Sequence, residues 1–545
     1  MNRKIFLCVT LLVISLLSGH ACTNLIVGKG VSADGSVIVS YSADSYGMFG
    51  HLCHYPAASH QPGEKRPIHD WDTGKYLGKI DEARTTYNVI GNMNEHQVTI
   101  GETTFGGREE LVDTTGIMDY GSLIYVALQR SRTAKEAIEV MTNLVKEYGY
   151  CSEGESFTIA DPTEVWIMEM IGKGPGVRGA VWVAVRVPDD CIAAHANQAR
   201  IRKFDLNDKE NCLYSPDVIS FAREQKYFFG KNTEFSFADA YCPLDFGGRR
   251  YCDARVWSFY NMFASGMDAY LPYINGESDE AMPLFVKPNR KLSVRDIQLA
   301  MRDHYEGTPL DITADLGAGP YSMPYRPSPL SFKVDGKEYF NERPISTQQS
   351  AFVFVAQMRS DKYNPMGGVL WFGTDDANMA VFTPVYCCTS TVPSCYSDKT
   401  ADAVTFSWNS SFWVFNWVSN MVYPRYNQLI EDLRKYQNEI ELGFLAVQDS
   451  IERQALALYE EDPAKAISFL NDYSVASAQN TLDAWKKLGE FLIVRHNDMV
   501  VKKVHPDGSF VKTSTGLCAP VERPGYPESY NRRVVQETGK RYEMK

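Results

Sequence analysis

Several features that would point to a common function class are missing from this sequence. It contains no Cys-x-x-Cys pair and no His-Glu-x-x-His motif, so neither a closed zinc site nor a zinc peptidase is supported. Positive charge is scarce, with 55 lysines and arginines against 67 aspartates and glutamates, and the net charge of −12 argues against a nucleic-acid partner. After the first 21 residues no apolar run approaches the roughly 18 residues that cross a bilayer. We therefore expect no metal, no cofactor, no nucleic acid and no membrane contact beyond export.

The first 21 residues have the pattern of an export signal. Arg3 and Lys4 are basic, residues 5–17 are apolar, and Gly19 and Ala21 are small at the two positions that a signal peptidase reads. We expect cleavage after Ala21 and a mature protein that is secreted or periplasmic. Removing 21 of the 545 residues leaves 524, enough for one large core and a smaller domain.

Cleavage after Ala21 would make Cys22 the first residue of the mature chain. Its thiol would then share a residue with a free α-amine, which titrates at about pH 8 and is able to accept the thiol proton. Two other interpretations stay open, namely an acylated lipoprotein cysteine and an ordinary disulfide cysteine. The lipoprotein pattern needs a leucine-like residue three places before the cysteine, where this chain has Gly19. The pattern therefore favours a nucleophile over an anchor.

Hydrophobic patterns along the mature chain predict a layered α+β architecture. Strand-like runs flank an Asp-Gly turn at residues 34–35, and this hairpin would bring Asp44 back toward Cys22. Asp44 is expected either to position the amine of Cys22 or to cap the turn that follows. A helical pattern covers residues 119–149. Further strands are expected at residues 156–170, 180–196 and 346–389, helices at 408–497, and a polar peripheral tail at 498–545.

The other cysteines suit an oxidising compartment. Ten remain when Cys8 and Cys22 are set aside, and several of them are expected to pair. The expected examples are Cys242 with Cys252, and Cys387 or Cys388 with Cys395. The sequence alone does not determine this connectivity.

Five ordered stretches together resemble the C69 family of dipeptidases, whose nucleophile is an N-terminal cysteine. They are Cys22-Thr23 with Asp34-Gly35-Ser36, residues 91–97, residues 154–162, residues 194–200 and residues 345–349. The resemblance implies a four-layer αββα sandwich of the N-terminal-nucleophile hydrolase type, exposure of the cysteine by proteolysis, and hydrolysis of dipeptides. The broader superfamily includes choloylglycine hydrolases and penicillin V acylases, which cleave other amides.

The resemblance also implies roles for single residues. It places Cys22 on the nucleophile, Asp44 on the aspartate that contacts it, Asn197 on an oxyanion-hole asparagine and Arg255 on a further arginine. One departure is that the superfamily commonly has Arg-Asn where this chain has Tyr41-Ser42. The positive charge that would lower the pKa of the thiol is therefore missing from that position. Without the resemblance, Asn197 would be interpreted as a turn residue and Arg255 as a surface salt-bridge residue.

Substrate-contacting residues are expected beside this set. Asn94 and Thr103 should line the cleft, and His195 is a candidate for recognising a charged end of a dipeptide. We expect a hydrolase domain at residues 22–400, and a helical segment at 401–497 that either covers this domain or forms a homo-oligomer contact. The tail at 498–545 should be peripheral.

The expected function is that of an exported cysteine dipeptidase acting through Cys22 on a dipeptide substrate. One alternative is an acyl-amide hydrolase of the choloylglycine hydrolase or penicillin V acylase kind. Another is a lipid-anchored binding protein acylated on Cys22, which would have no hydrolytic activity.

Overall fold

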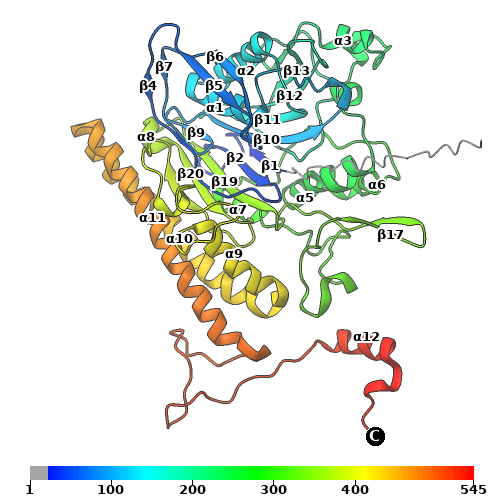
Figure 1. Ribbon diagram of the computed structural model, residues 1–545, viewed down its shortest axis with the longest axis vertical. Coiled ribbons are helices and arrows are strands. Elements are labelled where there is room, and N and C mark those ends of the chain that lie inside the picture. Colours follow the sequence, from blue (N-terminus) through cyan, green and yellow to red (C-terminus); the bar gives the residue numbers. More distant parts are fainter. Residues whose placement is uncertain (1–21) are drawn as a thin grey trace, which may run out of the picture.

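The structure is a computed structural model that describes residues 22–545 (Figure 1). The export signal predicted at residues 1–21 lies outside the described residues. The main body consists of antiparallel β-sheets with helices packed against them, and a long helical segment follows toward the C-terminus. The α+β prediction is confirmed at this level. Within residues 22–545, no helix combines the length and the apolar character needed to cross a membrane.

The first large sheet has seven strands in the order β16-β14-β1-β2-β19-β20-β21. Their bounds are Asn24–Val27 (β1), Val37–Asp44 (β2), Ile192–His195 (β14), Phe285–Val286 (β16), Ser350–Met358 (β19), Val369–Thr374 (β20) and Thr383–Tyr386 (β21). β1 and β2 form the predicted hairpin. Its turn residue Gly35 has a φ of +76°, a conformation open to glycine because it has no Cβ atom. A further bridge pairs Thr23 with Ser42, so the end of β2 lies beside the residue that precedes β1.

The second large sheet has eight strands in the order β15-β13-β12-β11-β10-β9-β8-β3. Their bounds are His54–Tyr55 (β3), Val89–Ile90 (β8), Met93–Asn94 (β9), Thr99–Gly106 (β10), Gly154–Ala160 (β11), Val165–Gly172 (β12), Ala180–Arg186 (β13) and Cys212–Tyr214 (β15). β9 pairs with β10 only at Thr99. Residues 101–106 of β10 therefore pair with β11 on one side and with no other strand of the described chain on the other. This free edge of β10 lies against the start of β1, where Asn24 Nδ2 donates to the Glu102 carbonyl oxygen at 2.7 Å.

The structure divides several of the predicted segments, and the strand predicted at 180–196 is β13 and β14, which belong to different sheets. The strand predicted at 156–170 is the hairpin of β11 and β12, because Asp161 Oδ1 accepts hydrogen bonds from N–H groups two and three residues later. The helix predicted at 119–149 is two helices, α1 (Tyr120–Arg130) and α2 (Ala134–Tyr148). Thr133 begins the second by accepting a hydrogen bond from the N–H of Glu136.

The helices and sheets stack in the order helix, sheet, sheet, helix (Figure 1). α1 and α2 pack on the outer face of the second sheet through a buried cluster that includes Leu123 and Phe157. A second cluster, with Ile167 and Phe354, fills the space between the two sheets. A third joins the outer face of the first sheet to α5 (Ala254–Phe263) and α7 (Val294–Ala300).

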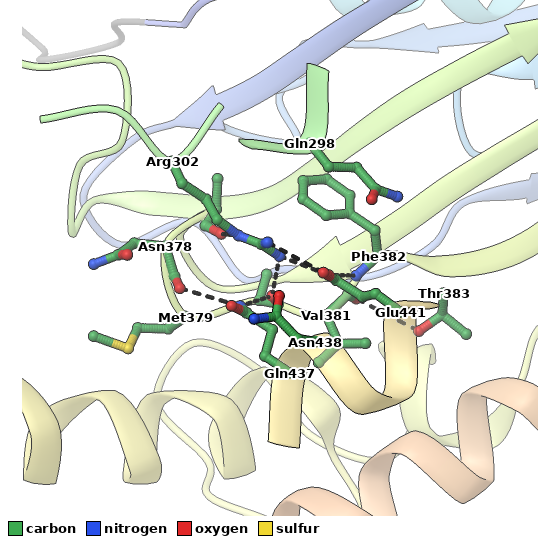
Figure 2. Close-up of polar contacts among 12 residues, drawn as sticks. Gln298, Arg302, Asn378, Met379, Val381, Phe382, Thr383, Gln437, Asn438 and Glu441 are labelled. Carbon is green, nitrogen blue, oxygen red and sulfur yellow. Dashed lines mark hydrogen bonds and ion pairs between the residues drawn. The ribbon is translucent and has the colours of Figure 1, made fainter. Parts of the chain in front are cut away.

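The C-terminal helical segment consists of α9 (Ser411–Val422), α10 (Tyr426–Glu461) and α11 (Pro463–His496). A buried carboxylate of α10 connects this helical segment to the main body through hydrogen bonds and an ion pair (Figure 2). Glu441, which is 1% exposed, accepts hydrogen bonds of 2.6 and 3.1 Å from the Arg302 guanidinium and one of 2.9 Å from the N–H of Phe382. Breaking a buried ion pair leaves an uncompensated charge, at a cost of about 3–5 kcal/mol. The segment is therefore an integral part of the fold.

The remaining elements are short. They are β4 (Ala58–Ser59), β5 (Lys65–His69), β6 (Tyr76–Asp81), β7 (Thr85–Thr86), α3 (Val218–Glu224), α4 (Phe237–Tyr241), α6 (Leu271–Ile274), β17 (Ser331–Val334), β18 (Lys337–Phe340), α8 (Asn364–Gly367) and α12 (Glu528–Thr538). α12, near the C-terminus, contains no buried residue.

The expected disulfides are absent, because every cysteine among residues 22–545 is a free thiol. The predicted pairings of Cys242 with Cys252, and of Cys387 or Cys388 with Cys395, are therefore wrong. Cys242 illustrates the reason, since its sulfur packs in the core and accepts a hydrogen bond of 3.2 Å from Gln198 Nε2. Buried thiols of this kind act as small apolar side chains.

Candidate active site

Cys22 lies two residues before β1, and its thiol contacts side chains from β2 and β10. Sγ is 3.3 Å from Oε1 of Glu102 and 3.6 Å from the hydroxyl oxygen of Tyr41. Tyr41 donates a hydrogen bond of 2.6 Å to the same oxygen of Glu102. All three side chains are buried. The residue predicted as the nucleophile therefore has a carboxyl group and a phenol as neighbours.

The surroundings of Cys22 oppose ionisation of its thiol. Burial raises the pKa of Cys22 well above its ordinary value, and the carboxylates of Glu102 and Asp44 raise it further. The backbone N–H of Asp44 and the hydroxyl of Tyr41 lower the pKa by less. While residue 21 is attached, the nitrogen of Cys22 is a peptide nitrogen and accepts no proton. The thiol of the uncleaved chain is therefore protonated near neutral pH and is a poor nucleophile.

A second buried carboxyl group, Glu155 of β11, lies beside Glu102. Burial raises the pKa of both groups, and the charge of Glu102 raises that of Glu155 further. The two carboxyls are in hydrogen-bonding contact with each other, and the hydroxyl of Thr104 donates to Glu155 Oε1 at 2.7 Å. Neither Oε2 has an N–H or hydroxyl partner in the described chain. Such a pair shares a proton, because two adjacent buried carboxyls do not both ionise.

Arg255 connects Cys22 with Asn197. Its Nη1 donates to the Cys22 carbonyl oxygen and to the hydroxyl of Thr23, both at 2.7 Å. Its Nη2 donates to Oδ1 of Asn197 at 2.9 Å and to the preceding carbonyl oxygen at 3.1 Å. Its Nε donates to the carbonyl oxygen of Tyr251 at 2.7 Å, so all five guanidinium N–H groups are used within the protein.

Asn197 follows β14 with a φ of +62°, a conformation that asparagine tolerates better than most residues. Because Arg255 holds Oδ1, the amide nitrogen faces the free edge of β10 and donates to the Thr104 carbonyl oxygen at 2.7 Å. This nitrogen carries a second hydrogen atom. The backbone N–H of Thr104 points to the same edge as its carbonyl, as in any strand. The edge therefore offers two N–H donors.

Arg343 brings a positive charge to Asp44. Its Nη2 lies 3.0 Å from Oδ2, and the hydroxyl of Ser350 donates to Oδ1 at 2.5 Å. Burial raises the pKa of Asp44, and both partners oppose that rise. Burial beside another arginine lowers the pKa of Arg343 to about 10. The sequence analysis missed this residue; the signal that could have found it is its position two residues before the matching stretch 345–349.

Comparison with known proteins identifies the family. A family model described as peptidase family C69 matches residues 21–439. The chain belongs to peptidase family C69. It is therefore a peptidase, and the resemblance inferred from five stretches of sequence is confirmed.

Relatives extend the similarity of this C69 peptidase over most of its length. The probable dipeptidase of Salmonella dublin is 29% identical over 67% of this chain and 81% of its own. The probable dipeptidase of Latilactobacillus sakei is 26% identical over 80% of this chain and 89% of its own. The probable dipeptidase B of Streptococcus pyogenes serotype M1 is 25% identical over 90% of this chain and 97% of its own.

In the C69 peptidase, three residues expected to contact substrate make their hydrogen bonds within the protein. Asn94 donates to two carbonyl oxygens at the end of α1 and accepts from two N–H groups of its own turn. His195 lies between the sheets, with the hydroxyls of Thr103 and Thr158 each 2.7 Å from one of its ring nitrogens. Burial lowers the pKa of His195 to about 3, so its ring is neutral. The side chain of Asn94 therefore stabilises its own turn, and the hydrogen bond between Thr103 and His195 connects the two sheets.

Two cavities of the C69 peptidase adjoin each other near Tyr41. The larger, of about 880 Å³, is lined mainly from residues 45–55 and 397–403. A smaller one reaches Tyr41 and shares Met48, Trp71 and Phe352 with the larger. Tyr41 in turn contacts the thiol of Cys22, which lines neither cavity. Among residues 22–545, no group of three or more His, Cys, Asp or Glu side chains is arranged to hold a metal ion.

Proposed function

We propose that this peptidase is an exported cysteine dipeptidase whose nucleophile is the thiol of Cys22, freed by cleavage after Ala21. The observation that carries the proposal is the Arg255 bridge, which holds the backbone of Cys22 and the amide of Asn197 in a fixed relation. A nucleophile and its oxyanion donor require such a relation. The names of the relatives, which are probable dipeptidases, support dipeptides as the substrate class.

In the mature chain, the α-amine of Cys22 takes the proton of the thiol on the same residue. The positive charge that results offsets Glu102 and Asp44, the carboxylates that raise the pKa of the thiol. The thiolate then attacks the peptide carbonyl carbon. The oxyanion receives hydrogen bonds from Asn197 Nδ2 and from the backbone N–H of Thr104, each worth about 3 kcal/mol in comparable sites.

The reaction is completed in two steps. The C–N bond breaks to give a thioester, and the α-ammonium gives its proton to the leaving amino group. Water, deprotonated by the α-amine, then attacks the thioester carbonyl and displaces the sulfur, which recovers its proton. The position of Cys22 before the first strand of a helix, sheet, sheet, helix arrangement supports an N-terminal-nucleophile hydrolase fold.

The proposal is tested first by the intact mass and N-terminal sequence of the protein recovered from an exporting cell. A chain that begins with unmodified Cys22 is expected, and it should hydrolyse dipeptides. Cys22→Ala should abolish this activity, and Cys22→Ser is the matched control that keeps an N-terminal nucleophile and its amine. An acylated Cys22, or cleavage elsewhere, would contradict the mechanism and favour the lipid-anchored alternative.

The size of the large cavity favours a second candidate function. A volume of about 880 Å³ exceeds what a dipeptide needs, and it suits the bulky amides that choloylglycine hydrolases and penicillin V acylases cleave. A panel of dipeptides, conjugated bile acids and penicillin V separates the two. We expect kcat/KM to be highest for dipeptides, and a preference for the other amides would identify an acyl-amide hydrolase.

A further inference from the structure

We propose that the buried pair Glu102 and Glu155 binds the α-ammonium group of the substrate's N-terminal residue. The inference rests on the proposed function, which places the scissile carbonyl at Cys22. These two carboxyls are then the reason why the peptidase requires a substrate with a free amino end.

Distances at the thiol place a substrate amine beside Glu102. In any peptide, the α-nitrogen and the carbonyl carbon of one residue are joined through a single carbon and lie about 2.5 Å apart. Oε1 of Glu102 is only 3.3 Å from the sulfur that attacks this carbon. When Sγ bonds to the first carbonyl carbon of a peptide, the α-nitrogen of that peptide is therefore within reach of Glu102, the carboxyl that contacts Glu155.

Other charged or titratable groups of the site are already engaged. Arg255 uses all five of its N–H groups within the protein, Asp44 accepts from an arginine and a serine, and His195 has a threonine hydroxyl on each nitrogen. By contrast, Glu102 is 2% exposed and Glu155 is 1% exposed, yet neither Oε2 has an N–H or hydroxyl partner in the described chain. Because the two carboxyls share one proton, the pair carries one buried negative charge, and a bound ammonium group would neutralise this charge and donate to the two Oε2 atoms.

The chemistry of the pair discriminates between free and blocked amino ends. An ammonium group brings both N–H donors and a positive charge to carboxyls that ionise with difficulty when they are alone. An N-acylated residue brings a neutral amide, so it leaves a buried negative charge without compensation. The pair thereby selects against peptide bonds in the interior of a longer chain. It recognises the amino end and leaves the carboxyl end to other groups.

The α-ammonium of the mature Cys22 is a competing occupant of the same carboxyl pair. Glu155 separates the two possibilities, because it lies on the neighbouring strand, where its side chain contacts Thr104 and Glu102. If the pair served only the ammonium of Cys22, loss of Glu155 would slow all substrates equally. If it serves the substrate, the loss affects only substrates that carry an amine.

The test compares Glu155→Gln with Glu153→Gln in the mature protein. Glu153 is a matched control because it is an exposed glutamate two residues earlier in the chain. The probes are Ala-Ala and propionyl-alanine, which differ only by the α-amino group, and the readout is the ratio of their kcat/KM values. We expect the wild type and Glu153→Gln to prefer Ala-Ala by roughly 100-fold or more. Glu155→Gln should reduce this ratio by roughly 30-fold, through Ala-Ala alone.

Each other outcome has a definite meaning. An unchanged ratio in Glu155→Gln, or an equal loss on both probes, would overturn the inference. If Glu155→Gln does not fold, Glu102→Gln is measured in the same way, since the ratio cancels its effect on the thiol. A mature wild type that hydrolyses neither dipeptides nor propionyl-alanine contradicts the proposed function, whereas one that hydrolyses both probes equally contradicts only the site for the ammonium group.

Discussion

Arg343 forms a buried ion pair of 3.0 Å with Asp44, from which it is separated by 299 positions in the sequence. The superfamily commonly carries an arginine where this chain has Tyr41, close to the same aspartate. Here the positive charge reaches the aspartate from the segment before β19 instead. Asp44 in turn presents its backbone N–H to the thiol of Cys22, so the ion pair supports a residue that contacts the proposed nucleophile.

Replacing this arginine should destabilise the protein. Arg343→Gln leaves the carboxylate of Asp44 buried without its charge partner, and we expect the free energy of unfolding to fall by about 3–5 kcal/mol. Asp44→Asn should also destabilise the fold, but the double variant removes both charges and should lose less than the sum of the two. Urea unfolding of the four proteins measures the difference. Strict additivity would show that the two side chains do not interact.

Processing should change the reactivity of Cys22. A chain blocked by Ala21→Phe keeps a peptide nitrogen on Cys22, and the raised pKa of its thiol makes alkylation by iodoacetamide slow at pH 7. The rate should then rise about tenfold per pH unit as the thiolate forms. The mature protein should react faster at pH 7, because the α-ammonium stabilises the thiolate. Mass spectrometry of the Cys22 peptide gives both rates, with the exposed Cys518 as internal control. Equal rates in the two forms would contradict a role for the amine.

The attachment of the helical segment should depend on Glu441. Glu441→Gln removes the charge that faces Arg302 and Arg295, and should lower the free energy of unfolding by about 3–5 kcal/mol. Glu461→Gln is the matched control on the same helix, since its ion pair with Lys465 is exposed and its loss should have no measurable effect. Similar results for the two variants would mean that the buried pair does not hold α10 in place.

His195 should make the fold sensitive to acid. Its pKa is about 3 in the folded chain and about 6.5 when unfolded, so between these values only the unfolded chain binds the proton. The free energy of unfolding that depends on His195 therefore falls as the pH drops below about 6.5, by about 1.4 kcal/mol per unit. His195→Gln removes this titration. The stability difference between wild type and variant should shrink by about 2 kcal/mol from pH 7 to pH 5 in urea unfolding, and a constant difference would refute the buried neutral ring.

Local sequence patterns predicted the part of the site that depends on near neighbours. The Asp-Gly turn set the β1–β2 hairpin, and this hairpin places Asp44 beside Cys22. The roles of Asn197 and Arg255 were predicted only from the family resemblance. No local sequence pattern shows that the guanidinium of Arg255 on α5 contacts Cys22. His195 was predicted to contact the substrate because a dipeptidase needs charged groups that recognise the ends of a dipeptide. Strand alternation instead turns it inward between the sheets.

The carboxyl pair depends on a property that the sequence does not display. Register between β10 and β11 sets Thr104 opposite Glu155 and Glu102 opposite Phe157, so the two glutamates share one face of the sheet. A shift of one residue would turn Glu155 to the other face. The expected disulfides failed for a similar reason, since bridging requires cysteines whose Cβ atoms approach within about 4.5 Å, and spacing along the chain does not reveal this.

The Arg255 bridge has a consequence for how activity begins. It is made to the carbonyl oxygen of Cys22 and the side chain of Asn197, two groups that cleavage of the bond before Cys22 does not alter. On the proposed route, cleavage supplies a proton acceptor and requires no rearrangement of the bridge. On this proposal the precursor is a zymogen, which one irreversible bond cleavage switches on. If the proposed export and cleavage are correct, the peptidase that removes the leader also activates the enzyme, and the active form arises only outside the cytoplasm.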